Sequence, residues 1–282
     1  MTIAAGIEAG QYLSIGGHNT HYHDVGSGDV VLFIHGSGPG VSAWANWQHT
    51  VPVLSRGARA LALDLVGYGL TDRPADVRYS LRTWTDHVWA FLDALDVDRV
   101  SVVGNSLGGR VALQMAEDQQ DRLHRMVLMG SPGPTMTVTD GLKALRAYEP
   151  SPEAMRSLLV DYFAVDPGII TDELVKIRYE ASALPGAHEA YRSMFFDPAH
   201  AGNQLGITEE QVRAVTVPAL VVQGREDRVV PKEVGWRLSE LLPNGDMHLF
   251  SRCGHWTQIE RASEFNRVVA DFLGLDIEGD QS

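Results

Sequence analysis

Six short apolar runs recur along this chain and limit it to a small set of folds. They are Val30–Ile34, Ala60–Leu63, Val100–Val103, Met126–Met129, Ala219–Val222 and Met247–Phe250. Most are continuous rather than alternating with polar residues, which is typical of parallel strands whose sheet is covered by helices on both faces. Helical patterns lie between them, at Trp84–Leu95, Gly109–Gln119, Trp236–Leu242 and Glu264–Leu273. This alternation predicts an α/β fold with a mostly parallel, doubly wound sheet.

The alternation stops between about Pro132 and Thr208. Here the sequence predicts only helices, at Gly141–Ala147, Pro152–Phe163 and Thr171–Ala183. We therefore expect a core, residues 1–132 and 209–282, and a helical insertion, residues 133–208, that forms a lid over the site. An ordinary packing appendage is the alternative interpretation of this insertion.

Composition disfavours several classes of partner. The 282 residues carry 23 Lys and Arg against 36 Asp and Glu, a net charge of −13, so their surface would repel a nucleic acid. The single cysteine, Cys253, excludes an internal disulfide and a cysteine-based metal cluster. No apolar run approaches the roughly 20 residues of a membrane span, and the first residues lack the pattern of a signal peptide. We expect a soluble, cytoplasmic protein with neither a membrane nor a nucleic-acid partner.

The segment Val100–Gly109, VSVVGNSLGG, contains the strongest chemical signal. A β-rich run leads directly into Gly-x-Ser-x-Gly and then into a helix, which is the context of a nucleophile elbow. Gly104 and Gly108 leave room where two stretches of backbone crowd together. Ser106 lies at a helix N-terminus, where free N–H groups favour a developing oxyanion. A glycine-rich turn with a bystander serine is the alternative, but the context identifies Ser106 as the candidate nucleophile of an α/β-hydrolase fold.

An acid and a histidine follow in the order that this fold uses, serine then acid then histidine. Asp227 follows the fifth apolar run and His255 follows the sixth. We expect His255 to take the proton of Ser106, and Asp227 to fix the tautomer of the imidazole and stabilise its charged form. Glu226 is the rival acid. The residues after the fourth run, Gly130–Pro132, contain no carboxylate, which favours an acid after the fifth.

A glycine-rich loop, His35–Gly40, follows the first apolar run. In this fold the oxyanion hole takes one N–H from the residue after the nucleophile, here Leu107, and one from this loop. Ser37 is our first choice for the loop donor and Gly38 the second. The loop lacks the Gly-Lys-Ser/Thr ending of a phosphate cradle and opens no dinucleotide fingerprint.

Two other groups of polar residues have structural interpretations. Asp64–Pro74 contains two carboxylates, but Asp side chains commonly cap turns, so we expect a structural turn rather than an acid/base pair. His21 and His23 share a strand face, yet a metal site would need further ligands from elsewhere in the chain. We expect no metal.

Together these motifs resemble the meta-cleavage-product hydrolases, the carbon–carbon bond hydrolases of bacterial aromatic degradation, and most closely their alkylbenzene-type members. The resemblance rests on HGSGPGVSAWANW (35–47), GNSLGG (104–109), RYEAS (178–182) and RCGHWTQIE (252–260). It covers the chain from about His23 to Phe272.

The resemblance implies a 2-hydroxy-6-oxohexa-2,4-dienoate as substrate, cleaved beside its 6-ketone to 2-hydroxypenta-2,4-dienoate and a carboxylic acid. It implies no cofactor, and it leads us to expect a homo-oligomer. The implied substrate-binding residues are Asn46, Asn105, Arg178 and Trp256. Arg178 would bind the carboxylate, since a planar guanidinium matches a carboxylate with two hydrogen bonds. The alternative for Arg178 is a surface charge paired with Glu180 or Asp172.

A serine carboxylesterase or thioesterase with the same triad is the alternative function, but it gives no reason for Arg178 or the paired asparagines. A haloalkane dehalogenase would carry Asp at position 106 and is excluded. A receptor without activity is compatible with the fold, and the complete triad disfavours it.

Overall fold

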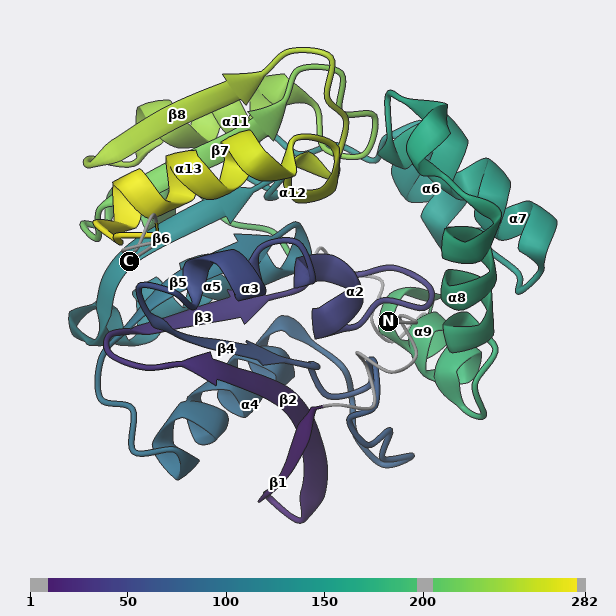
Figure 1. Ribbon diagram of the computed structural model, residues 1–282, viewed down its shortest axis with the longest axis horizontal. Helices are drawn as coiled ribbons and strands as arrows, with labels where there is room; N and C mark the ends of the chain where they lie inside the picture. The colour runs from purple at the N-terminus through teal and green to yellow at the C-terminus, as the bar shows by residue number, and fades with distance from the viewer. Residues whose placement is uncertain (1–9, 197–204, 278–282) are drawn as a thin grey trace, which may run out of the picture.

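The computed structural model describes residues 10–196 and 205–277, which form one eight-stranded sheet flanked by helices (Figure 1). The strands are β1 (Gln11–Ile15), β2 (His18–Gly26), β3 (Val30–Ile34), β4 (Arg59–Leu63), β5 (Val100–Asn105), β6 (Leu123–Met129), β7 (Ala219–Gly224) and β8 (Gly245–Phe250). Their order across the sheet is β1-β2-β4-β3-β5-β6-β7-β8. Strands β3 to β8 pair in parallel, and β2 pairs antiparallel with both β1 and β4. The predicted α/β fold is confirmed.

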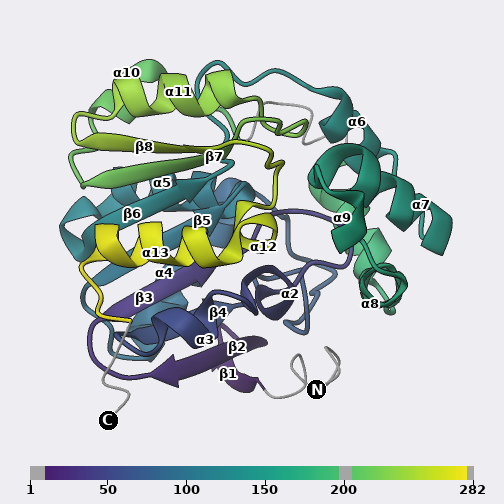
Figure 2. The same ribbon diagram turned by 45° about the horizontal axis from the view of Figure 1, so that its top comes forward.

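The central strands are buried on both faces, which explains their continuous apolar runs. On β3, Leu32 and Ile34 belong to a core shared with α4 (Leu81–Ala94), α5 (Leu107–Gln119) and α11 (Lys232–Leu241). Val31 and Phe33 belong to the opposite core, shared with α2 (Ala43–Trp47), α3 (Val51–Leu54) and α13 (Ala262–Leu273). Helix α13 lies across the near face of the sheet in Figure 2. Alternate side chains of one strand therefore enter two different apolar layers.

A second group of helices lies beyond the carboxyl ends of the parallel strands, away from the helices that cover the sheet (Figures 1 and 2). They are α6 (Asp140–Arg146), α7 (Pro152–Leu158), α8 (Asp172–Ser182) and α9 (Ala187–Phe196), with a π turn at Leu159–Phe163 and a 3₁₀ turn at Pro167–Ile169. We call residues 140–196 the helical insertion. Its apolar side chains form a separate small core that includes Val229 and Trp256 from the loops after β7 and β8. The insertion is therefore packed onto the loops that carry the predicted acid and histidine.

Short helices α10 (Glu209–Arg213) and α12 (Thr257–Glu260) and a 3₁₀ turn at Gln120–Arg122 complete the described chain. No helix in the described ranges is long and apolar enough to cross a membrane.

The antiparallel pair β1–β2 was not among the predicted strands, because most of its buried residues are polar. On β2, Thr20, His21 and His23 are all at most 5% exposed. Thr20 Oγ1 lies 2.7 Å from His87 Nε2, and His21 Nδ1 lies 2.8 Å from Asp64 Oδ2. Polar side chains that find partners inside the protein leave no hydrophobic periodicity for a sequence pattern to detect.

Helices α4 and α11 begin at Leu81 and Lys232, three and four residues earlier than predicted. At α4 the first turn is fixed by a cap rather than by apolar residues: the Ser80 hydroxyl accepts a hydrogen bond from Thr83 N at 3.1 Å.

Three histidines with lowered pKa values should make this fold sensitive to acid. Burial lowers the pKa of His35 from its ordinary value of 6.5, and it lowers the pKa values of His23 and His87 to about 4. Below about pH 6.5 the unfolded chain binds protons at these positions that the folded chain does not bind, and for His23 and His87 this difference persists until near pH 4. The free energy of unfolding should therefore fall with pH across this window, by about 1.4 kcal/mol per pH unit for each histidine.

Urea unfolding between pH 7 and pH 4.5 measures this slope, and His87→Gln provides a matched comparison. Val66 N donates to His87 Nδ1 at 3.2 Å, so the half-buried ring is neutral, and an amide can occupy the same place without titrating. The variant should lose about one histidine's share of the slope. An identical slope in both proteins would contradict this account of His87.

Candidate active site

Ser106 lies on a strained turn between β5 and α5. Its backbone angles are φ 51° and ψ −113°, a region that residues with a side chain rarely adopt. A Cβ on Gly104 would lie 2.4 Å from Gly108 O, and a Cβ on Gly108 would lie 2.1 Å from Ile34 O. Both positions therefore exclude any residue but glycine, and the serine is held where strand, turn and helix backbones meet.

His255 and Asp227 form a buried pair beside this turn. His255 Nδ1 lies 2.8 Å from Asp227 Oδ2, and the two side chains are 3% and 0% exposed. Because a carboxylate accepts hydrogen bonds, Nδ1 carries the ring proton and Nε2 is left as an acceptor. Asp227 Oδ1 accepts from the backbone N–H groups of Val229 and Val230 at 2.8 and 2.9 Å, which fixes the plane of the carboxylate.

The loop after β6 brings the serine and the histidine together. Ser106 N donates to Met129 O at 2.8 Å. A Cβ on the next residue, Gly130, would lie 2.9 Å from His255 Cε1 and 3.4 Å from Asp227 Oδ2. The three predicted triad residues therefore all lie against Met129 or Gly130.

Glu226 points to other partners. Its Oε2 accepts from Cys253 N at 3.0 Å, and its Oε1 accepts from Arg225 Nε at 2.8 Å. Its side chain is 33% exposed, whereas that of Asp227 is fully buried against the histidine. Geometry therefore favours Asp227 as the acid.

The glycine-rich loop after β3 passes directly over the nucleophile turn. A Cβ on Gly36 would lie 3.2 Å from Ser106 Cβ and 2.8 Å from Asn105 Oδ1. His35 fixes the loop from below: its Nδ1 donates to Gly36 O at 2.7 Å, and its Nε2 accepts from Leu65 N at 3.0 Å. Both ring nitrogens are thereby used by the neutral form, which agrees with the lowered pKa of His35.

Three backbone N–H groups near Ser106 remain free within the described part of the chain. Ser37, Gly38 and Leu107 donate no backbone hydrogen bond there. These are the predicted donors of an oxyanion hole, and they are available to an oxygen of a bound molecule.

Arg178 is buried on α8 and is not a surface charge. It is 5% exposed, and its Nε has no hydrogen-bond partner among the described residues. The alternative pairing is wrong, because Asp172 contacts Arg156 and Glu180 lies 3.4 Å from Lys176 Nζ. Burial lowers the pKa of Arg178 to about 10.

The guanidinium of Arg178 reaches the core loops. Its Cζ lies 5.4 Å from the centre of a Trp256 ring, and its Nη2 would lie 3.7 Å from a Cβ on Gly38. A buried cation without a carboxylate partner is unfavourable unless an anion meets it. The arrangement can therefore bind an anionic group beside the glycine-rich loop.

The other predicted binding residues are all buried. Asn46, on α2, is buried, and its Nδ2 has no partner among the described residues. Trp256 is buried, with its ring 4.9 Å from the ring of Phe163. Asn105 Nδ2 donates to Met129 O at 3.3 Å, so this amide also holds the nucleophile turn.

Comparison with known proteins agrees with this site. Residues 29–262 match the family model described as the alpha/beta hydrolase fold. The 2-hydroxy-6-oxo-2,4-heptadienoate hydrolase of Pseudomonas putida is 45% identical over 270 residues, which cover 95% of this chain and 98% of the relative. The 2-hydroxymuconate semialdehyde hydrolase of a Pseudomonas species is 43% identical over 267 residues, 94% of each chain. A solved structure of CumD, a meta-cleavage product hydrolase from Pseudomonas fluorescens, has a TM-score of 0.91 at 46% identity and covers 95% of this chain and 98% of its own.

The chain belongs to the meta-cleavage product hydrolases of the α/β-hydrolase family. The resemblance predicted from the sequence is thereby confirmed.

Two residues of this hydrolase were not foreseen from its sequence. Phe163 ends the π turn of the insertion, and its carbonyl accepts from His255 N at 2.8 Å while its ring lies 5.4 Å from the imidazole. Gln223, on β7, donates from Nε2 to Asp227 Oδ2 at 3.0 Å. Neither belongs to a motif. A π turn often marks a functional site, but no sequence pattern predicts one.

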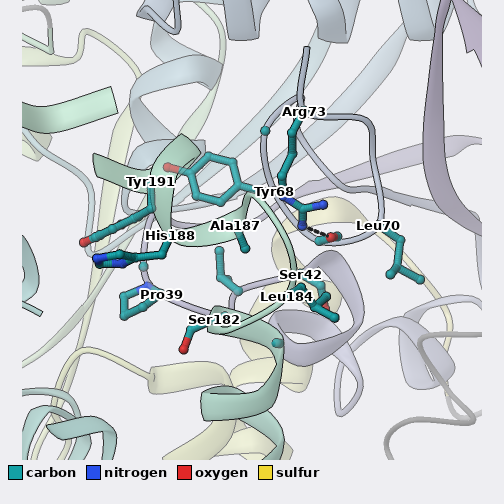
Figure 3. A pocket seen from close by; sticks show the side chains of 16 residues that line it. Pro39, Ser42, Tyr68, Leu70, Arg73, Ser182, Leu184, Ala187, His188 and Tyr191 are labelled. Carbon is teal, nitrogen blue, oxygen red and sulfur yellow. Dashed lines mark hydrogen bonds between the residues drawn. The ribbon is translucent and has the colours of Figure 1, made fainter. Parts of the chain in front are cut away.

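A narrow pocket lies on the seam between the hydrolase core and the insertion (Figure 3). It is lined by residues 38–42 of the glycine-rich loop, by Arg73 and Tyr68 from the loop after β4, and by His188 and Tyr191 from α9. The triad residues do not line it. Because Gly38 borders both this pocket and Arg178, the seam opens directly beside the predicted oxyanion hole.

The loop after β4 and the neighbouring histidines have structural roles. Asp64 accepts from Ala43 N and Leu70 N at 2.6 and 2.8 Å, besides its contact with His21. In the described ranges no group of three or more His, Cys, Asp or Glu side chains is placed to hold a metal.

Glycine at position 106 should stabilise the fold while alanine should not. The backbone angles of Ser106 strain any residue with a Cβ, and glycine adopts them freely. We expect the free energy of unfolding of Ser106→Gly to exceed that of Ser106→Ala by about 1 kcal/mol, as measured by urea denaturation. Equal stabilities would show that the turn is not strained.

Proposed function

We propose that this hydrolase cleaves the carbon–carbon bond beside the 6-ketone of a 2-hydroxy-6-oxohexa-2,4-dienoate. The products are 2-hydroxypenta-2,4-dienoate and a carboxylic acid. The observation that carries this proposal is Arg178, a buried guanidinium without an ion-pair partner in the described residues, next to the loop that covers Ser106. An ester substrate needs no such cation, whereas a dienoate brings a carboxylate into the site. The names of both curated relatives support the same substrate class.

The proposed roles follow from the hydrogen bonds of each group. With its Nδ1 proton on Asp227, His255 has Nε2 available to receive the proton of Ser106. The N–H groups of Leu107 and Ser37, with Gly38 as the second choice, would stabilise the oxyanion formed at the ketone. Arg178, Asn46, Asn105 and Trp256 would hold the carboxylate and the neighbouring 2-oxygen.

The reaction that these groups serve has two stages. The enol proton leaves the 2-oxygen and a proton is delivered to carbon 5, which gives the keto tautomer. An oxygen nucleophile, from Ser106 or from a water that it activates, then adds to the ketone at carbon 6. As the bond between carbons 5 and 6 breaks, its electron pair returns into the departing 2-hydroxydienoate, and water supplies the second oxygen of the acid product. His255 carries the protons between these stages.

The helical insertion contributes Arg178 while the core contributes the triad, so we propose that the predicted lid, residues 133–208, completes the site of the core, residues 1–132 and 209–282. Residues 1–9, 197–204 and 278–282 of these ranges lie outside the described residues. An assembly of identical chains and a cytoplasmic location are further parts of the proposal. They rest on family resemblance and on composition.

The triad assignment is tested by three substitutions. Ser106→Ala should lower turnover of the dienoate by about 10³-fold or more, and Asp227→Asn should lower it by about 10³- to 10⁴-fold, because an amide favours the wrong tautomer of His255. Glu226→Gln is the control and should remain within a few-fold of the parent. Steady-state kinetics measure all three. Damage by Glu226→Gln, with Asp227→Asn unaffected, would identify Glu226 as the acid.

The substrate class is tested by Arg178→Gln. Losing a charge-assisted contact at a desolvated site costs about 2–5 kcal/mol, so kcat/KM for the dienoate should fall roughly 30- to several-thousand-fold. An uncharged aryl ester should lose only a few-fold. Arg156→Gln, which removes a half-exposed arginine that contacts Asp172, is the matched control and should affect neither substrate. Equal losses on dienoate and ester would assign Arg178 a structural role and favour an esterase.

A further inference from the structure

We propose that Gln223 is a positioning residue of the triad, which determines how Asp227 meets His255. This inference rests on the proposed roles of Ser106, Asp227 and His255. Gln223 touches neither the nucleophile nor the predicted binding residues, so it would act through the acid alone.

The amide of Gln223 joins the acid to its own loop. Gln223 is fully buried on β7, and its Nε2 donates to Asp227 Oδ2 at 3.0 Å and to Val230 O at 2.9 Å. Asp227 Oδ2 is the same oxygen that lies 2.8 Å from His255 Nδ1. Oδ1 is occupied by the backbone N–H groups of Val229 and Val230. The amide of Gln223 therefore links β7 to the carboxylate of Asp227 and to the turn that follows it.

The other polar atom of this amide, Oε1, makes no hydrogen bond in the described ranges, so the side chain contributes only the two bonds from Nε2. Gln223 Oε1 is buried and has no partner in the described ranges, and a Cβ on Gly235 of α11 would lie 2.8 Å from it. A buried acceptor without a donor is unfavourable, and an apolar side chain of similar length would avoid the cost. Reversing the amide would place Oε1 against the carboxylate, where both groups accept hydrogen bonds. The amide is therefore held with its N–H groups towards Asp227.

The second donor on Oδ2 affects the base as well as the acid. Asp227 stabilises the imidazolium that His255 becomes during the reaction, and a hydrogen bond from Gln223 draws part of the carboxylate charge away from it. Without this bond, Asp227 would favour the imidazolium more strongly and would be oriented less tightly. Turnover should fall, and the base should lose its proton only at higher pH.

Other charged and titratable groups near the pair are already engaged. Cys253 is buried, which raises the pKa of its thiol and keeps it neutral. Glu226 accepts from the backbone of Cys253, and Arg228 Nη1 donates to Asp161 O at 2.7 Å. Arg178, on α8, contacts Trp256 rather than the imidazole. Gly130 after β6 and Phe163 of the π turn face the pair, and Gly235 on α11 faces Gln223. None of these residues titrates.

The test is the pH dependence of kcat/KM for Gln223→Met, which keeps the length of the side chain and removes the donor. We expect kcat to fall about 10-fold or more, KM to stay within a few-fold, and the acid limb of the profile to move to higher pH. The matched control is Asn266→Leu. Asn266 is another buried amide, donating to His49 O at 2.8 Å with its Oδ1 unpartnered in the described ranges, and it lies on α13. This control should leave the acid limb unmoved.

A second variant keeps the inference testable if the methionine protein does not fold. Gln223→Glu has the size of the parent, and its protonated carboxyl group can donate to Asp227 Oδ2. Once it ionises, two carboxylates face each other, so activity should be lost at alkaline pH where the parent remains fully active. A profile that matches the parent for either variant would overturn the proposal.

Failure of this inference is distinguishable from failure of the proposed function. The profile can be measured on an aryl ester as well as on the dienoate, because both would use the same triad. If Ser106→Ala abolishes turnover while Gln223→Met leaves the profile unchanged, Gln223 has no positioning role and the triad stands. If Ser106→Ala retains near-normal turnover on both substrates, the triad itself is wrong.

Discussion

Backbone crowding at the carboxyl ends of the parallel strands is the constraint on which the rest of the structure depends. At Gly108 a Cβ would lie 2.1 Å from a carbonyl oxygen of β3, and at Gly224 it would lie 2.0 Å from Gly254 O in the loop of the histidine. The helix start after the serine therefore touches β3 backbone to backbone, and the strand end before the acid touches the loop of the histidine in the same way. Such contacts have little freedom to shift, which holds the reacting groups in place more tightly than flexible side chains could.

The helical insertion is joined to this crowded edge at the histidine. Phe163 O accepts from His255 N, and Glu260 accepts from Val165 N of the insertion and from Gly254 N of the histidine loop, each at 2.7 Å. Burial raises the pKa of Glu260, which is the cost of placing a carboxyl group at this junction. The same insertion carries Arg178. In the proposed function, the binding residue and the base are therefore joined through a few hydrogen bonds between the insertion and the histidine loop.

The sequence predicted those parts of the molecule that local chemistry determines. The six parallel strands follow from burial on both faces, and the nucleophile turn follows from Gly104 and Gly108, which only glycine can occupy. Residues that form long-range hydrogen bonds show no comparable pattern in the sequence. Strand β2 buries His21, whose partner Asp64 comes from the loop after β4. Gln223 is one more polar residue at a strand end until the fold brings Asp227 beside it. Hydrophobic periodicity shows which face of a helix or strand is buried, whereas the places of these residues are determined by individual hydrogen bonds.

Three features that the fold tolerates at a cost lie around the proposed reaction. Ser106 has a strained backbone, Arg178 is a buried cation without a carboxylate in the described residues, and Gln223 leaves a buried oxygen unpaired. The strained backbone and the unpaired oxygen each cost about 1–3 kcal/mol, the buried cation costs more, and the two large apolar layers around the sheet offset these costs. The buried Asp64 shows the contrast, because its carboxylate is bonded to two backbone N–H groups and a histidine. A buried charge with all its partners supports the structure, whereas a buried cation without a carboxylate partner is a candidate for binding an anion. By this criterion Arg178 is a candidate for the site and Asp64 belongs to the scaffold.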